Sequence, residues 1–348
     1  MNIVRTNKRK RILIGLVGAI ITLCIASAFG NASDPNYQRT ERTGQYIFPR
    51  IAQQIERAKI IRVKLGDTAY TLKRTEPGGP DWVMIEAGNY PVRADRLAAL
   101  AEGLLNLQWG DARTKDPEKF DRIGLGDPAE GGNGAYLEIL DQQDNKISSL
   151  ITGRREDRLY ARFPDENKAF RADGNLPPLY TREAWLDFDI VDMLPEVVGA
   201  VRMTDARGRS LYLTRAPGSS ARSFRPAPPF EADRLISRLA ASVPALALSR
   251  LAPIDVKPAA ALETRRVGRH ITSTHDGLEV DVSAYREPDG FFITLHAVEA
   301  GEGARRAVTI NKKAAGWAYK LTEFDWNDFT PPMRSLVVRG EPAAAATP

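Results

Sequence analysis

Short stretches of alternating apolar and polar residues, separated by turns that contain Gly and Pro, run through most of this chain. Residues 60–85, "IIRVKLGDTAYTLKRTEPGGPDWVMI", predict two strands around a Gly-Asp turn and a third short strand after a Pro-Gly turn. Residues 198–224, "VGAVRMTDARGRSLYLTRAPGSSARSF", contain the same elements in the same order. The second strand ends in arginine in both stretches, at Arg74 and Arg215. Each stretch is typical of a β-meander.

A helical pattern follows each meander and begins with the same tetrapeptide, ADRL, at Ala94 and at Ala232. Apolar residues recur there at steps of three and four, which predicts two amphipathic helices with the core residues Leu97, Leu100, Leu104 and Leu107, and Leu235, Leu239 and Val243. We expect acids in the N-cap or first turn at Asp95 and Asp233, and solvent-facing bases at Arg96 and Arg234.

Hairpin patterns come next, from Gly134 ("GAYLEILDQQDNKISSLITG") and from Gly277 ("GLEVDVSAYREPDGFFITLHA"). A short strand with an aromatic and a basic residue follows each, at residues 158–163 and 316–321. If the tetrapeptide were repeated by chance, the same elements would not be expected to flank both copies in the same order. We therefore predict an α+β protein of two tandem repeated units, residues 45–190 and 191–340, each an antiparallel or mixed sheet with amphipathic helices.

The N-terminal segment has a different pattern, because Ile12–Phe29 is 18 residues long and carries no charge. Such a helix is about 27 Å long, close to the thickness of the hydrocarbon core of a bilayer. This length favours a transmembrane anchor at residues 12–29, although Ala26-Ser27-Ala28 also fits cleavage after Ala28. We expect a cytoplasmic basic end (1–11), a linker (30–44), a periplasmic body and a mobile tail (341–348), in a single-pass protein of the bacterial inner membrane.

The charge distribution argues against a nucleic-acid partner. The first 11 residues hold five of the 49 Lys and Arg residues and none of the 44 Asp and Glu residues, so the rest of the chain is formally neutral. Phosphate binding needs a basic face, and a neutral body gives no general reason to expect one. The single cysteine, Cys24, lies in the apolar segment, so the body cannot form an internal disulfide.

Several longer motifs carry a resemblance to a known family: "YIFPRIAQQIERAKIIRV", "YPVRADRLAALAEGLLNL", "GRREDRLYARF" and "REAWLDFDIVDMLP". Following a membrane segment, this organisation is similar to the domain-of-unknown-function 4340 (DUF4340) family. The resemblance implies a membrane-tethered accessory partner of an ABC-type export system. It brings no catalytic residue with it.

Candidate chemistry is sparse. The three histidines, His270, His275 and His296, lack the spacing of metal ligands, and we expect them at the surface or in turns. The Gly-rich segment 124–135 precedes a strand, whereas a phosphate cradle precedes a helix, so we interpret it as a flexible connector. The tryptophans are expected to be core anchors; they are Trp82, Trp109, Trp185, Trp317 and Trp326.

The acids of "WLDFDIVDM" are the remaining candidates: Asp187, Asp189 and Asp192. They could supply paired carboxylates for glycoside hydrolysis. Alternatively the acids face water while the apolar residues between and around them are buried, namely Trp185, Phe188, Ile190 and Leu194. We favour the second interpretation.

The sequence therefore predicts a non-catalytic, membrane-tethered periplasmic protein without cofactor or metal, which contacts an ABC-type transport system or an envelope assembly. The alternative is an exported carbohydrate-binding or hydrolytic envelope protein that uses Asp187, Asp189 and Asp192.

Overall fold

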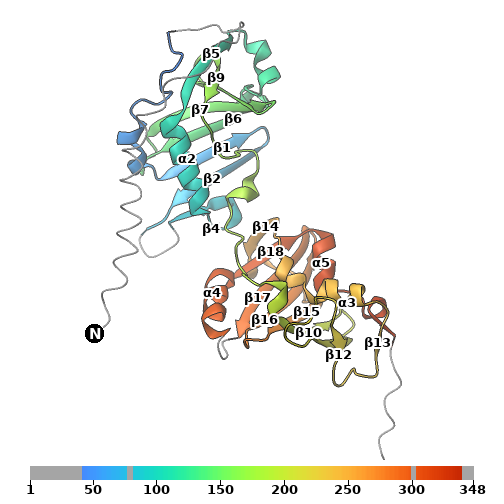
Figure 1. The fold of residues 1–348 in the computed structure, drawn as a ribbon. Helices are drawn as coiled ribbons and strands as arrows, with labels where there is room; N and C mark the ends of the chain where they lie inside the picture. Colours follow the sequence, from blue (N-terminus) through green and yellow to red (C-terminus); the bar gives the residue numbers. More distant parts are fainter. Residues whose placement is uncertain (1–40, 77–80, 299–302, 339–348) are drawn as a thin grey trace, which may run out of the picture.

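This computed structural model describes residues 41–76, 81–298 and 303–338. Figure 1 shows two sheets, one built from the first half of the described chain and one from the second, each accompanied by helices. All the strand pairings are antiparallel, so the predicted α+β class is confirmed. The predicted anchor at residues 12–29 lies outside the described residues, as do the basic end and the tail. Within the described part of the chain, no helix has the length and apolar character needed to cross a bilayer.

The first sheet has nine strands. Alternate residues of β1 (Ile60–Leu65) and β2 (Thr68–Arg74) are buried as cross-strand pairs, with Ile61 opposite Leu72 and Val63 opposite Tyr70. The spatial order of this sheet is β4 (Tyr90–Pro91), β3 (Trp82–Met84), β2 (Thr68–Arg74), β1 (Ile60–Leu65), β6 (Ala135–Leu140), β7 (Lys146–Arg155), β8 (Arg158–Arg162), β9 (Ala169–Asp173) and β5 (Gln108–Thr114).

Helix α2 (Ala94–Asn106) lies across the first sheet in Figure 1. Leu100 and Leu104 are buried, Leu97 packs against the core, and the helix ends before the fully buried Leu107. Asp95 occupies the first turn and pairs with Arg93 (2.7 Å) instead of capping the helix. The predicted first helix is therefore confirmed.

The second sheet has eight strands: β12 (Arg225–Pro226), β11 (Ser210–Thr214), β10 (Val198–Thr204), β15 (Gly268–Thr274), β16 (Glu279–Glu287), β17 (Gly290–Val298), β18 (Trp317–Leu321) and β14 (Asp255–Pro258). Its helices are α3 (Arg238–Ala245), α4 (Ala304–Ala314) and α5 (Glu323–Phe329). A separate ribbon joins β13 (Arg234–Leu235) to β19 (Val337–Val338).

Short 3₁₀ helices connect many of these elements: η1 (Ile51–Gln53), η2 (Ile55–Arg57), η3 (Ile85–Ala87), η4 (Pro117–Ile123), η5 (Pro128–Glu130), η6 (Arg182–Trp185), η7 (Pro195–Val197), η8 (Ala247–Arg250), η9 (Ala259–Ala261) and η11 (Met333–Ser335).

The two sheets have the same strand order. The series β3-β2-β1-β6-β7-β8-β9-β5 in the first matches β12-β11-β10-β15-β16-β17-β18-β14 in the second, and β4 has no counterpart. This order corrects the predicted downstream alignment by one strand. The hairpin β6–β7 occupies the place of β15–β16 rather than β16–β17, and β8 occupies the place of β17 rather than β18.

The second ADRL does not begin a helix, which corrects the sequence prediction. Arg234 and Leu235 form β13, because their backbone groups pair with Val337 and Val338 of β19. Helix α3 starts three residues later, where the Ser237 hydroxyl accepts a hydrogen bond from the amide of Ala240. As a consequence Asp233 lies outside the helix, and Leu239, expected in the core, is 54% exposed.

The two sheets meet at an aromatic contact between β4 and β18. The ring of Tyr90 lies edge-on to Trp317, with 4.9 Å between the centroids, and Tyr319 also lies against it. An ion pair between Arg182 and Asp255 (2.6 Å) crosses the same junction. These contacts join the two units through buried aromatic surface.

Candidate functional site

The three acids predicted as carboxylate candidates lie next to this junction, among basic side chains of α4. Lys313 of α4 lies 3.8 Å from a carboxylate oxygen of Asp187 and 3.9 Å from one of Asp189. Asp192 is exposed, and its backbone carbonyl accepts a hydrogen bond from Arg306 (3.0 Å). Two of the three carboxylates therefore share one lysine.

The apolar residues around these acids follow the predicted burial only in part. Trp185 and Ile190 are buried and Phe188 is half-buried. Leu194 is 63% exposed, so its predicted burial is wrong. Met193 is buried in its place, so the alternation shifts by one residue just before η7 begins at Pro195.

A groove of about 660 Å³ beside these acids has a lining of mixed charge. Arg93 and Asp95 neutralise one another on one wall, and Lys313 faces Asp187 and Asp189 on the other. Most opposite charges are therefore paired within the wall, whereas Arg96 adds a cation whose buried Nε has no hydrogen-bond partner among the described residues.

The histidines do not form a site. His270 is fully buried, its Nε2 lies 2.9 Å from the carbonyl oxygen of Pro244, and burial lowers its pKa to about 4. His275 and His296 are exposed. The expected surface or turn position is therefore wrong for His270, which fills the core beneath Phe329. In the ranges that the structure describes, no group of three or more His, Cys, Asp or Glu side chains could hold a metal ion.

The Gly-rich segment 124–135 is closely packed, which corrects its interpretation as a flexible connector. A Cβ atom at Gly153 of β7 would lie 2.0 Å from the carbonyl oxygen of Gly124. The side chain of Asp121 accepts a hydrogen bond from the amide of Asn133 (3.0 Å) and so ties the two ends of the loop together. The glycines permit close backbone contact rather than ligand binding.

The tryptophans behave as core anchors, as predicted. Trp109, Trp185 and Trp326 are buried, and Trp82 and Trp317 are half-buried against the core. Trp326 also takes part in the one feature below that has the character of a binding site.

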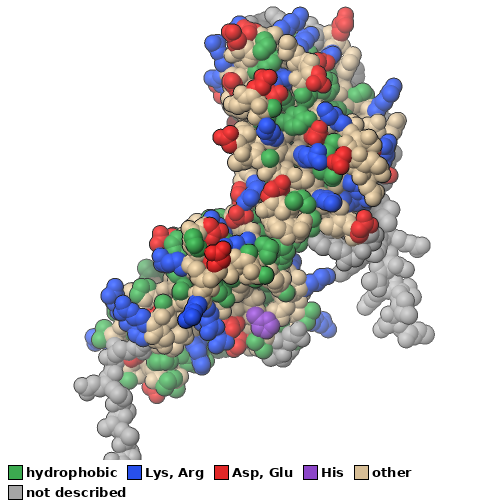
Figure 2. Space-filling view, turned by 180° about the vertical axis from the view of Figure 1, so that it is seen from behind, with side chains coloured by type: hydrophobic (Ala, Val, Ile, Leu, Met, Phe, Trp, Pro, Cys, Tyr) green, Lys and Arg blue, Asp and Glu red, His purple; other side chains and the backbone are tan. Residues whose placement is uncertain are grey.

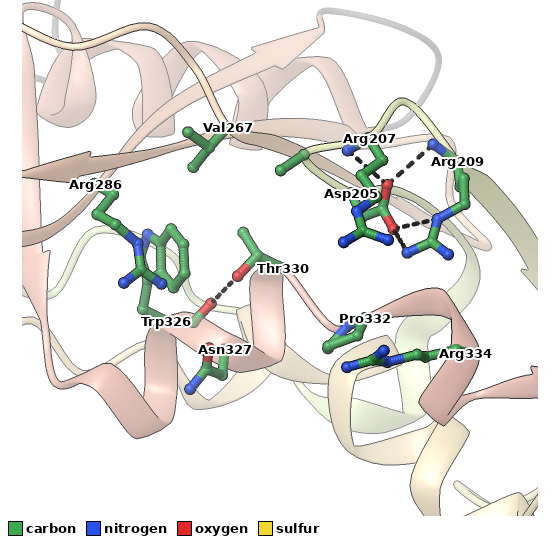
Figure 3. A pocket seen from close by; sticks show the side chains of 11 residues that line it. Asp205, Arg207, Arg209, Val267, Arg286, Trp326, Asn327, Thr330, Pro332 and Arg334 are labelled. Carbon is green, nitrogen blue, oxygen red and sulfur yellow. Dashed lines mark hydrogen bonds and ion pairs between the residues drawn. The ribbon is translucent and has the colours of Figure 1, made fainter.

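A pocket of about 350 Å³ lies at the end of the second sheet, between the β10–β11 turn, the end of β16 and the segment that begins with α5 (Figure 3). Its charged lining is mainly basic, and the charged residues are Asp205, Arg207, Arg209, Arg286 and Arg334. This volume lies at the lower end of the range typical of small-molecule and side-chain pockets.

Asp205 organises one rim of the pocket. Its carboxylate accepts hydrogen bonds from the amides of Arg207 (2.9 Å) and Arg209 (3.0 Å), and from the Arg209 guanidinium (2.6 Å). Burial alone would raise the pKa of Asp205, but the hydrogen bonds from Arg209 and the turn amides lower it below its usual value. Asp205 is thus ionised and neutralises Arg209, while the side chain of Arg207 stays available.

Arg286 forms the opposite rim. Its guanidinium carbon lies 5.2 Å from the centre of the Trp326 ring and 4.9 Å from that of Phe291, which is the geometry of a cation–π contact. Trp326 is itself held by a hydrogen bond from its indole nitrogen to the carbonyl of Phe292 (3.3 Å). The aromatic rings therefore orient the guanidinium without neutralising it.

Arg334 stands below the pocket in Figure 3, beside Pro332. Arg207, Arg286 and Arg334 are exposed, and none of the three pairs with a carboxylate of the described residues. Between them lie Val267, Pro332 and Thr330, whose hydroxyl donates to the carbonyl of Trp326 (3.2 Å). The arrangement is a small, partly apolar cavity, and the cations around its rim can bind an anionic group by donating hydrogen bonds to it.

This pocket cannot be predicted from local sequence patterns, because its parts are distant along the chain. The turn at residues 205–209 lies within a predicted meander and Arg286 within a predicted hairpin, while Arg334 belongs to no motif. A detectable signal was "TDARGRS", in which two arginines flank a turn glycine after a single acid.

Comparison with known proteins gives one family. A family model described as a domain of unknown function, DUF4340, matches residues 82–264, which is more than half of the chain. Neither the curated proteins nor the solved structures contain a significant match to the chain.

Proposed function

The chain belongs to the DUF4340 family, and from this premise we propose that it is a non-catalytic accessory protein that binds a component of an ABC-type transport system or envelope assembly. In this proposal residues 12–29 anchor the protein in the bacterial inner membrane, with residues 1–11 in the cytoplasm and the body in the periplasm.

The arginine-lined pocket is the observation that carries the proposal. Arg207, Arg286 and Arg334 gather around one cavity without a carboxylate of the described residues to neutralise them. Like charges held together lower the stability of the free protein, and a partner's anionic group offsets that cost. Figure 2 shows large Lys and Arg patches on the second unit, whereas acids and bases are more mixed on the first.

The shared strand order supports the proposed architecture. The two units have the same strand order and are joined at the contact of Tyr90 with Trp317 and Tyr319. In this proposal the first unit follows the membrane anchor and the second unit carries the binding pocket. A membrane tether keeps such a body at high local concentration near membrane partners, so a modest interface is sufficient for binding.

The hydrolytic alternative needs carboxylates that are free to act on a substrate. Asp187 and Asp189 instead share Lys313, and Asp192 lies with Asp189 in a groove that Arg305, Arg306 and Lys313 also line. We therefore give this alternative second place.

Removing the tether tests the proposal. A strain that makes the body behind a cleavable signal, in place of the anchor, should lose the function of the native protein even when the body is exported in equal amount. A body that fully replaces the native protein would contradict a tethered role. A control in which residues 12–29 are exchanged for another single-pass anchor should retain function.

A further inference from the structure

We propose that the arginine-lined pocket is a receptor for a carboxylate-bearing peptide segment, with an apolar side chain next to its acids, on the protein's partner. This inference rests on the proposed function and specifies the chemistry of the partner at this site.

The charges around the pocket complement an anionic ligand. Three guanidinium groups, on Arg207, Arg286 and Arg334, approach the cavity from different elements, and Asp205 is already used by Arg209 and by the turn amides. An anion placed between the rims would therefore meet cations on several sides (Figure 3). Guanidinium groups bind carboxylates through two parallel hydrogen bonds, which gives geometric selectivity as well as attraction.

Two of the cations are held in place by contacts within the protein. The Arg286 guanidinium is stacked on Trp326 and Phe291, and Trp326 is fixed by its bond to Phe292. The turn that carries Arg207 is held by the hydrogen bonds to Asp205. Because these cations are already oriented, a ligand loses less free energy in ordering them.

The lining between the cations favours a peptide over a free inorganic anion. Val267, Pro332 and the edge of Trp326 provide apolar surface next to the charges. This surface suits the side chain of an apolar residue that neighbours an acid in a peptide, whereas phosphate would leave it exposed to water. A cavity of about 350 Å³ accommodates one or two side chains rather than an extended sugar chain.

The test uses the full-length protein in nanodiscs of uncharged lipid and two labelled hexapeptides with blocked ends. The first is Glu-Leu-Glu-Glu-Leu-Glu, and the second has Gln in place of every Glu. Fluorescence anisotropy should show binding of the first that weakens as salt is added, and no binding of the second.

Two pocket variants and a control make the assignment specific. Arg286→Gln and Arg334→Gln should each weaken binding of the acidic peptide roughly tenfold, which corresponds to one lost charge-assisted hydrogen-bonding group. Arg238→Gln, an exposed arginine on α3 outside the pocket, should change binding less than about twofold. Each variant should stay folded, with a free energy of unfolding within about 1 kcal/mol of the native value, because no described carboxylate pairs with these arginines and Arg286→Gln loses a cation–π contact.

Three outcomes would overturn the proposal. The Gln peptide could bind as tightly as the Glu peptide, or the Arg286→Gln and Arg334→Gln variants could bind the Glu peptide as tightly as the native protein does. The third is that inorganic phosphate at millimolar concentration, or phosphatidylglycerol vesicles, displace the labelled peptide at a lower concentration than unlabelled peptide does. None of them bears on tethering, which the anchor-exchange experiment measures separately. Conversely, a free body that replaces the native protein would contradict the tethered role and leave the peptide result intact.

Discussion

The ring of Tyr90 in the first sheet meets the ring of Trp317 in the second edge to face, with 4.9 Å between their centroids. The Tyr90 hydroxyl donates a hydrogen bond to the backbone carbonyl of Asp187 (2.7 Å), so the same side chain also fixes the chain that connects the sheets. The junction is thus a packed interface rather than a simple linker.

Truncating Tyr90 should therefore destabilise the protein. We expect Tyr90→Phe to lower the free energy of unfolding by about 1 kcal/mol, through the lost hydrogen bond. Tyr90→Ala should cost about 3–5 kcal/mol, because it also leaves a cavity in the aromatic cluster. Urea unfolding followed by circular dichroism measures both. Tyr46→Phe, at a residue that is 48% exposed, is the matched control and should change little; equal effects at both positions would contradict the role of Tyr90.

Stability should fall in mild acid because of His270. Burial lowers the pKa of His270 to about 4, whereas the unfolded chain has the ordinary value of 6.5. Between these two values only the unfolded chain takes up the proton, so the free energy of unfolding falls as the pH drops from about 6.5 to about 4. The full loss is on the order of 3 kcal/mol.

Unfolding measured at half-unit pH steps checks this expectation. His270→Gln should flatten the slope in that window, and His275→Gln, at an exposed histidine, should leave it unchanged. An unchanged slope in His270→Gln would contradict a neutral, buried His270 as its cause.

Glu287 should make stability depend on pH in a more acidic range than His270 does. Hydrogen bonds from the Thr264 hydroxyl and from the amides of Glu263 and Thr264 lower its pKa to about 2. Its stabilisation is therefore fully present above about pH 4.5 and is lost as the pH falls through about 2. Glu287→Gln should lower the free energy of unfolding by about 2 kcal/mol at pH 7, and the difference from the native protein should shrink below pH 4. Asp289→Asn, at an exposed neighbour that also contacts Lys257, is the control; a difference that does not depend on pH would exclude ionised Glu287 as its source.

The local parts of this fold could be predicted from the sequence, and the parts made by distant contacts could not. Strands β1 and β2 and helix α2 follow their own apolar periodicity, since each buries one face against a near neighbour. The second ADRL has the same letters as the first, but Leu235 pairs with Val337 about a hundred residues away, and this pairing overrides the helical pattern. The pocket could not be predicted for the same reason. Arg207, Arg286 and Arg334 are brought together only by the pairing of distant strands and by the path of the chain after β18.

Replacing the three junction acids tests the hydrolytic alternative. We expect Asp187→Asn, Asp189→Asn and Asp192→Asn, combined in one protein, to leave growth, cell shape and release of wall fragments unchanged. The free energy of unfolding should fall by less than about 1 kcal/mol, since the ion pairs with Lys313 are partly exposed. A wall-fragment phenotype from this variant at native protein levels would favour the alternative.

Photo-cross-linking in intact membranes identifies the protein that binds at the arginine-lined pocket. A photoreactive amino acid at Ala206, on the exposed rim of the arginine-lined pocket, is compared with one at Ala98, exposed on α2 of the first unit. We expect Ala206 to capture a permease or another membrane component of an ABC-type system, identified by mass spectrometry. This capture should decrease in the Arg286→Gln, Arg334→Gln background and should be absent at Ala98. Capture of wall-processing enzymes alone, or of the same products from both positions, would contradict the account.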